Sequence, residues 1–172
     1  MRIFVLIYIK INMAKTRKNR GAQRSHKRGG KKSLRSSLEM PSSGSTLEKE
    51  ITLIFFQILL MIKLFHWKTY SYATHKATDE LYGKFNEHMD RFIEVLLGKL
   101  GNRIDLTNIK SIPLVDLNNP AQLKQKIEWF KSYLVNLDNH RTIKSMSNTD
   151  LLNIRDEILG DLNQFLYLLT FK

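Results

Sequence analysis

Residues 50–67, EITLIFFQILLMIKLFHW, form a long apolar stretch in this 172-residue chain. In a helix, its apolar side chains would cover nearly every side, interrupted only by Thr52, Gln57 and Lys63. The uninterrupted apolar part is shorter than the ~20 residues that a transmembrane helix needs. The stretch therefore predicts a helix buried on several faces inside a protein, with no membrane partner.

Three more segments have the periodicity of amphipathic helices, and alternating β-branched runs are scarce. A capping box of Ser45 and Glu48 marks the start of the first helix, and the second helix is predicted from about Thr74 to Leu100, before Gly101. Asn119 with Pro120 marks the start of the third helix, and Ser147 or Asn148 caps the fourth. The predicted fold is all-α, a four-helix bundle. The segment between the second and third helices is long enough to cross the bundle, and we expect a short helix in it.

The excess positive charge is confined to the N-terminal arm. The formal net charge is +12. Residues 1–38 hold 12 Lys/Arg and no Asp/Glu, whereas residues 39–172 hold 16 of each and are neutral overall. Residues 13–44 have almost no apolar content beyond their first residues, which predicts a disordered arm rather than part of the core.

A dense cationic segment without acids gains binding free energy by releasing counterions from phosphates. The arm therefore predicts salt-sensitive, sequence-independent contact with DNA or another nucleic acid. A solvated solubility tail and a nuclear-import signal have the same composition and remain alternatives. The predicted contacts are Lys15, Arg17, Lys18, Arg20, Arg24, Lys27, Arg28, Lys31, Lys32 and Arg35.

The absence of cysteine excludes disulfides, thiolate metal ligands and a cysteine nucleophile. Residues 1–12, MRIFVLIYIKIN, are hydrophobic, but no small-residue cleavage site follows them. We expect them to be an extension ahead of a natural start at Met13, followed by the arm at 13–44 and the helical bundle at 45–172. This organisation predicts a cytoplasmic or nucleic-acid-associated protein, with a virion as an alternative location.

The second predicted helix carries possible metal ligands along one side. With ~100° per residue and His75 at 0°, Asp79 lies near 40°, Asp90 near 60° and Glu94 near 100°. The apolar residues that predict the core contact lie on another side, between about 240° and 320°. The helix therefore has a core stripe and a separate stripe of imidazole and carboxylate groups.

One helix cannot bring both pairs of this stripe to a single metal. His75 and Asp79 are one turn apart, as are Asp90 and Glu94, but 11 residues, or ~16 Å, separate Asp79 from Asp90. Metal–ligand bonds are ~2 Å long. An antiparallel two-fold pairing would place His75 and Asp79 of one subunit opposite Asp90 and Glu94 of the other, which makes two sites per dimer.

His66, at the end of the first helix, is a candidate extra nitrogen ligand, and Trp67 is a candidate apolar wall. Mixed imidazole and carboxylate ligands suit Fe, Mn or Zn, and open positions with redox chemistry favour iron. In the alternative interpretation the candidate histidine and carboxylate ligands are ordinary surface residues, and Asp90 pairs with Arg91 or a nearby lysine.

Two other histidines receive no metal role. His88 lies near 220°, away from the ligand stripe. His140, at the predicted end of the third helix, is interpreted as a C-terminal cap.

At these residues the chain resembles the Dps proteins, the small ferritin-like "DNA-binding proteins from starved cells". Their pattern is His-Trp at the end of the first helix, then His-x3-Asp, then Asp-x3-Glu beginning 15 residues after that second His. The matching residues here are His66 with Trp67, His75 with Asp79, and Asp90 with Glu94. The resemblance covers roughly residues 45–170.

The resemblance implies a ferritin-like bundle with a crossover between helices two and three. It also implies a ferroxidase site, with one or two irons, between His66, His75 and Asp79 of one subunit and Asp90 and Glu94 of its partner. Fe(II) would be oxidised there by peroxide or oxygen. The ferric product would be stored in a shell of twelve subunits, protecting DNA against oxidative stress, and other divalent metals could also bind.

The chain departs from the family between His66 and His75, where it is three residues shorter than the usual spacing and lacks a Gly-containing turn. This leaves open whether His66 reaches the other ligands. A ferritin-like structural or DNA-packaging protein without ferroxidase activity is the main alternative. A basic-tailed RNA- or ribosome-associated protein is a further one.

Overall fold

The computed structural model describes residues 45–171. The expected N-terminal extension at 1–12 and the basic arm at 13–44, with all of its predicted nucleic-acid contacts, lie outside the described residues. The elements are α1 (Leu47–Lys68), α2 (Tyr72–Leu100), α3 (Pro120–Asn136), η1 (Leu137–Asn139), α4 (Arg141–Lys144) and α5 (Thr149–Leu168). No strand occurs among the described residues, so the prediction of an all-α fold is confirmed.

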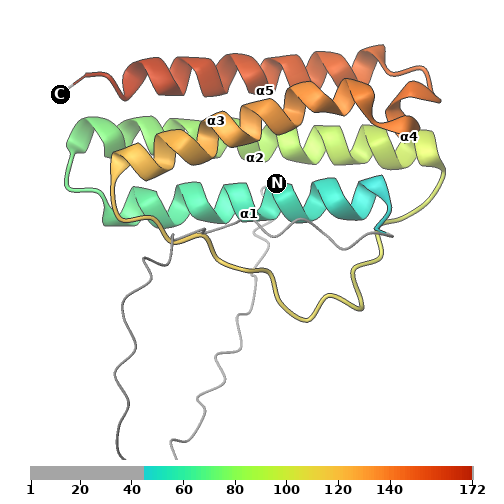
Figure 1. The fold of residues 1–172 in the computed structure, drawn as a ribbon, viewed down its shortest axis with the longest axis horizontal. Helices are drawn as coiled ribbons and strands as arrows, with labels where there is room; N and C mark the ends of the chain where they lie inside the picture. Colours follow the sequence, from blue (N-terminus) through green and yellow to red (C-terminus); the bar gives the residue numbers. More distant parts are fainter. Residues whose placement is uncertain (1–44, 172) are drawn as a thin grey trace, which may run out of the picture. The chain divides into compact units, whose positions relative to one another are not determined.

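The four long helices lie side by side, and the loop after α2 sets their directions (Figure 1). A tight turn reverses the chain between α1 and α2. The loop from Gly101 to Asn119 then runs back along the bundle, so that α3 points the same way as α2 (Figure 1). This loop holds no helix, so the short helix expected in it was a wrong prediction.

Local signals explain most helix starts. Ser71 caps α2, because its Oγ accepts the Thr74 N–H at 3.2 Å, and the helix begins slightly before the expected residue. The predicted start of α3 is confirmed, with Asn119 Oδ1 accepting the Gln122 N–H at 3.0 Å. Gly101 ends α2 in the left-handed conformation, with φ of 66°.

The predicted capping box at the start of α1 was wrong. Thr46 rather than Ser45 is the N-cap residue, and its side chain makes no capping hydrogen bond. Glu48 is 9% exposed, so it is buried against the bundle instead of reaching back to cap the helix. The end of α3 was also incompletely predicted, because η1 and α4 follow it.

Phe55 of α1 lies at the centre of the core. Its ring meets Phe85 and Phe92 of α2 edge-on at 5.5 Å, and Phe130 of α3 at 6.0 Å. Phe165 of α5 is 2% exposed and belongs to the same cluster. Edge-to-face packing satisfies the ring quadrupoles, so these contacts fix the relative rotation of the helices as well as excluding water.

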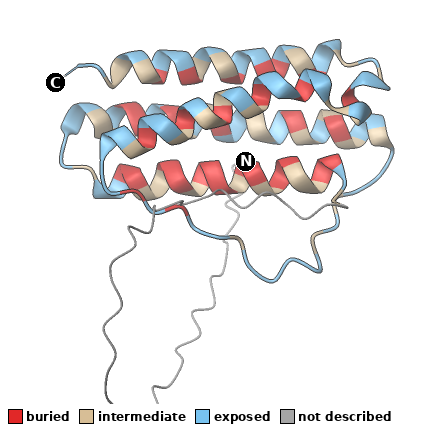
Figure 2. Ribbon diagram, in the orientation of Figure 1, coloured by how far each residue is buried: buried red, intermediate tan, exposed pale blue. Residues whose placement is uncertain are grey.

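Helix α1 is buried on most of its surface, as Figure 2 shows. Among the described residues it is the one helix long and apolar enough to cross a membrane by length and composition. However, 61% of the qualifying window is buried inside the bundle. A core helix of a soluble bundle has the same composition, and this burial agrees with the predicted role of α1.

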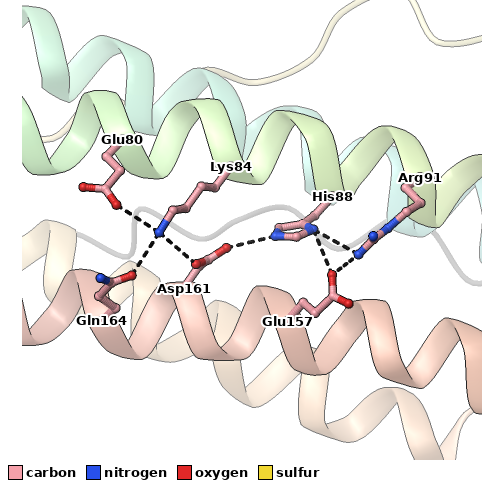
Figure 3. Close-up of polar contacts among 7 residues, drawn as sticks. All are labelled: Glu80, Lys84, His88, Arg91, Glu157, Asp161 and Gln164. Atoms are coloured by element: carbon pink, nitrogen blue, oxygen red, sulfur yellow. Dashed lines mark hydrogen bonds and ion pairs between the residues drawn. The ribbon is translucent and has the colours of Figure 1, made fainter.

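A polar ladder joins α2 to α5 (Figure 3). His88 Nε2 lies 2.9 Å from Asp161 Oδ2, and Lys84 Nζ lies 3.3 Å from Asp161 Oδ1. Arg91 pairs with Glu157, whose carboxylate is also 3.4 Å from His88 Nδ1. His88 therefore serves the helix contact, in agreement with its exclusion from the ligand stripe.

Candidate metal site

The short turn between α1 and α2 places His66 directly against His75. Residues 69–71 close the turn, in which the Thr69 N–H donates to Phe65 O at 3.0 Å and the His75 N–H donates to Ser71 O at 2.8 Å. The two imidazole rings stack, with centroids 3.9 Å apart and planes 24° apart. The shortened spacing therefore keeps His66 beside the second histidine.

Backbone hydrogen bonds define the tautomer of both rings. His66 Nδ1 lies 3.0 Å from the carbonyl oxygen of His75, and His75 Nδ1 lies 3.1 Å from the carbonyl oxygen of His66. Because a carbonyl only accepts, each Nδ1 carries the proton and donates it. In the neutral rings the lone pair then lies on Nε2, which is the arrangement that a metal-ligating histidine needs.

We call the hydrogen-bonded pair of His66 and His75 the histidine clasp. His66 is its buried member, and His75 is its more exposed member. His66 is 7% exposed, and Thr78, whose Oγ1 lies 3.3 Å from His66 Nδ1, is fully buried beneath it. His75 is half-buried. The reciprocal hydrogen bonds thus hold one ring rigidly in the bundle and present the other near the surface.

Asp79 is the third predicted ligand that the fold brings to this place. Its Oδ1 lies 3.8 Å from His66 Nε2, and its side chain is 54% exposed. Two donor atoms bound to one metal at ~2.1 Å are roughly 3 to 3.5 Å apart. A shift of a few tenths of an ångström would therefore let His66 and Asp79 bind the same ion.

Lys63 is a fourth member of this group that the sequence interpretation missed. Its Nζ lies 3.9 Å from Asp79 Oδ1, 4.5 Å from the ring centroid of Tyr82 and 5.8 Å from that of Trp67. The ammonium thus supplies a positive charge beside the carboxylate. The signal available in the sequence was its position one turn before His66 and Trp67 on a helix that otherwise has few charges.

Asp90 and Glu94 lie apart from this group, further along α2. Both side chains are exposed, and neither makes a side-chain hydrogen bond or an ion pair within residues 45–171. Arg91, the alternative partner considered for Asp90, instead pairs with Glu157 of α5. The second pair is therefore free of the surface contacts that the alternative interpretation assigned to it.

A single copy of the described chain does not form a complete metal site. No group of three or more His, Cys, Asp or Glu side chains within residues 45–171 is arranged to hold a metal ion. Trp67, predicted as an apolar wall, is 68% exposed. Within the described chain, the pair Asp90 and Glu94 therefore lies apart from His66, His75 and Asp79.

Lys99 and His140 make contacts that support the fold and do not belong to the group of candidate ligands. Lys99 donates to Ser147 O at 2.7 Å and pairs with Asp150 at 2.9 Å, so it joins the end of α2 to the start of α5. His140 was predicted to cap the end of α3. It instead precedes α4, where its Nδ1 accepts the Thr142 N–H at 3.2 Å, because the chain turns through η1 before it reaches His140.

Comparison with known proteins places the candidate ligands in one family segment. A family of unknown function, DUF5856, matches residues 66–169. The chain belongs to this family. The matched segment begins at His66 and includes all five predicted ligands, whereas the basic arm and most of α1 lie outside it. No curated protein and no solved structure matches the chain.

Proposed function

We propose that this chain is a Dps-like member of the ferritin-like superfamily that oxidises Fe(II) at a site shared between two subunits. The observation that carries the proposal is the histidine clasp. His66 and His75 hold each other by their Nδ1 atoms, which leaves both Nε2 lone pairs free, and His66 Nε2 lies 3.8 Å from Asp79 Oδ1. Asp90 and Glu94, unpaired in the described chain, would complete the site from the partner subunit.

The order of helix directions supports this family. A long connection that returns the chain along the bundle between its second and third helices is a feature of ferritin-like folds. The loop from Gly101 to Asn119 makes such a return (Figure 1). An up-and-down bundle with short loops would instead reverse direction at every connection.

The outer faces of α1 and α2 support a dimer. On α1, a stripe that includes Phe56, Leu60 and Leu64 is only partly buried. On α2, Ile93 is likewise partly buried and lies between Asp90 and Glu94 in the sequence. A second copy packed on this surface would bury the apolar stripe and bring the two half-sites together by symmetry.

In the proposed reaction Fe(II) is the substrate. Each hydrogen peroxide takes two electrons from two Fe(II) ions and is reduced to two hydroxide ions, and oxygen is the alternative oxidant. The imidazole and carboxylate ligands suit both Fe(II) and Fe(III), and the carboxylates stabilise the higher charge of the product. The ferric product would be stored as mineral within a twelve-subunit shell, and the basic arm would hold DNA nearby.

The direct test is the rate of Fe(II) oxidation by peroxide. Glu94→Gln keeps size and hydrogen bonding but removes a ligand charge, and we expect it to lower the protein-dependent rate at least tenfold. Glu128→Gln is the matched control, because Glu128 lies exposed on α3 and pairs with Lys131 there. Equal rates for wild-type protein and Glu94→Gln would reject the proposal.

A non-enzymatic packaging function is the second candidate, and one contact favours it. Lys63 already places a positive charge 3.9 Å from Asp79 Oδ1, as a structural ion pair would. Salt-dependent retention of DNA together with no acceleration of Fe(II) oxidation would support this function over the ferroxidase.

A further inference from the structure

A cleft of about 600 Å³ opens at the other end of the bundle from the histidine clasp. The residues that line it come from the start of α1, the end of α3, η1 and the residue before α4. The volume is in the range of sites that bind small molecules. None of its lining residues belongs to the candidate metal site, so the cleft is independent of the proposed ferroxidase.

Aromatic rings form one wall of the cleft. Trp129 and Tyr133 stack with centroids 5.9 Å apart and planes 15° apart. Both rings are half-buried, which fixes their positions while leaving part of their surface facing the cleft. The faces of such rings carry partial negative charge and attract cations, and tryptophan does so most strongly.

A carboxylate stands beside these rings without a cation. The Tyr133 hydroxyl donates to Glu50 Oε1 at 3.3 Å, which occupies one of the acceptor positions of the carboxylate. No basic side chain pairs with Glu50 within residues 45–171, and the cleft lining contains no lysine or arginine. Among the described residues the cleft therefore holds one carboxylate that has no cationic partner, next to an aromatic wall.

The cleft lining also offers hydrogen-bond donors. His140 Nδ1 accepts the Thr142 N–H, so the proton of the neutral ring lies on Nε2. Asn139 Oδ1 accepts from Lys144 Nζ at 3.4 Å, which leaves the amide N–H groups of Asn139 available. These donors suit an oxygen acceptor on a ligand whose other end is cationic.

We propose that this cleft binds an organic cation, a guanidinium or alkylammonium group, held between Glu50 and the Trp129–Tyr133 wall. His140 and Asn139 bind an acceptor oxygen at the other end of the ligand. A basic amino acid has both ends, and so does a basic side chain within a peptide. Anionic ligands are disfavoured, because the one charged group in the lining is a carboxylate.

The experiment uses the full chain and two matched probes. Arginine and citrulline have nearly the same shape, but citrulline lacks the positive charge. We expect isothermal titration calorimetry to detect arginine binding at least tenfold tighter than citrulline binding. Arginine blocked at its amino and carboxyl ends separates the two sources: undiminished affinity indicates a peptide side chain, and weaker affinity indicates the free amino acid.

A charge-removing variant tests the role of the carboxylate. Glu50→Gln keeps an oxygen that can accept from the Tyr133 hydroxyl, and we expect it to bind arginine at least tenfold more weakly. Glu80 is exposed on α2, so Glu80→Gln removes the same charge elsewhere and should leave binding unchanged. Far-ultraviolet circular dichroism of both variants excludes unfolding as the cause.

Three results would overturn the inference. The first is the absence of saturable arginine binding up to about 10 mM, which corresponds to less than ~3 kcal/mol of binding free energy. The second is citrulline binding as tight as arginine binding. The third is an unchanged arginine affinity in folded Glu50→Gln.

Discussion

Removing the positive charge of Lys63 should strengthen metal binding at the candidate site. A divalent ion at His66 and Asp79 must replace the Lys63 ammonium near the carboxylate and is repelled by it. Lys63→Met removes the ammonium but keeps an unbranched apolar side chain that can lie against Tyr82. Lys63→Arg is the matched control, because it keeps the charge.

The size of the effect follows from the distance and the exposure. Lys63 Nζ and Asp79 Oδ1 are 3.9 Å apart, and the two side chains are 27% and 54% exposed. Unit charges at such a distance interact by about 1 kcal/mol in water and by about 4 kcal/mol at an effective dielectric constant of 20. Exposure of Asp79 favours the lower figure, about 1 kcal/mol, which is roughly a fivefold change in affinity.

Calorimetric titration with Zn(II), which has no redox chemistry, measures this change without oxidation. We expect Lys63→Met to bind Zn(II) about fivefold more tightly than wild-type protein, and Lys63→Arg to bind like wild-type protein. The gain should shrink as salt rises from 50 to 500 mM, because salt screens exposed charges. Unchanged or weaker Zn(II) binding by Lys63→Met would refute the assignment of Lys63 as a competitor for the metal.

The remaining predictions concern stability. In a double-mutant cycle by urea unfolding, replacing His88 and Asp161 with leucine should give a coupling free energy of about 1 to 2 kcal/mol, because both side chains are mostly buried; a coupling near zero would contradict the ladder. Burial raises the pKa of Tyr133, so the folded protein disfavours its ionised form. Wild-type protein should therefore lose stability relative to Tyr133→Phe as pH rises above about 10, the pKa of unfolded tyrosine, and a constant difference from pH 8 to 11 would oppose this. Gly101→Ala should cost about 1 kcal/mol because φ is 66°, whereas Gly98→Ala, in helical backbone with open space around it, should stabilise by up to ~1 kcal/mol.

The sequence was sufficient where a structural feature depends on neighbouring residues. Periodicity predicted the long helices, and Asn119 with Pro120 predicted the start of α3, because these signals act within one turn. The spacing from Asp79 to Asp90 likewise predicted that these two residues lie too far apart along α2 to share one metal ion. Burial of Glu48 depends on tertiary packing, so the capping box predicted from its spacing to Ser45 was wrong.

The features that the sequence could not predict join residues from different elements. Whether His66 reaches His75 depends on the path of the turn at residues 69–71, which no periodicity specifies. The position of Lys63 beside Asp79 depends on the rotation of α1 against α2. The aromatic cleft was missed for the same reason, since Glu50 and Trp129 come together only when α1 and α3 pack.

If two subunits share each site, dimers that combine two different defective subunits should regain activity. The variant pair His75→Ala, Asp79→Ala destroys one half-site, and Asp90→Ala, Glu94→Ala destroys the other. Each protein alone should be inactive in Fe(II) oxidation.

Co-expression of the two variants gives the decisive measurement. Random pairing makes about half of the dimers mixed, and each mixed dimer has one intact site out of two. We therefore expect about a quarter of the wild-type oxidation rate in the co-expressed sample. A co-expressed sample as inactive as the separate variants, although mass analysis shows mixed dimers, would contradict the shared site.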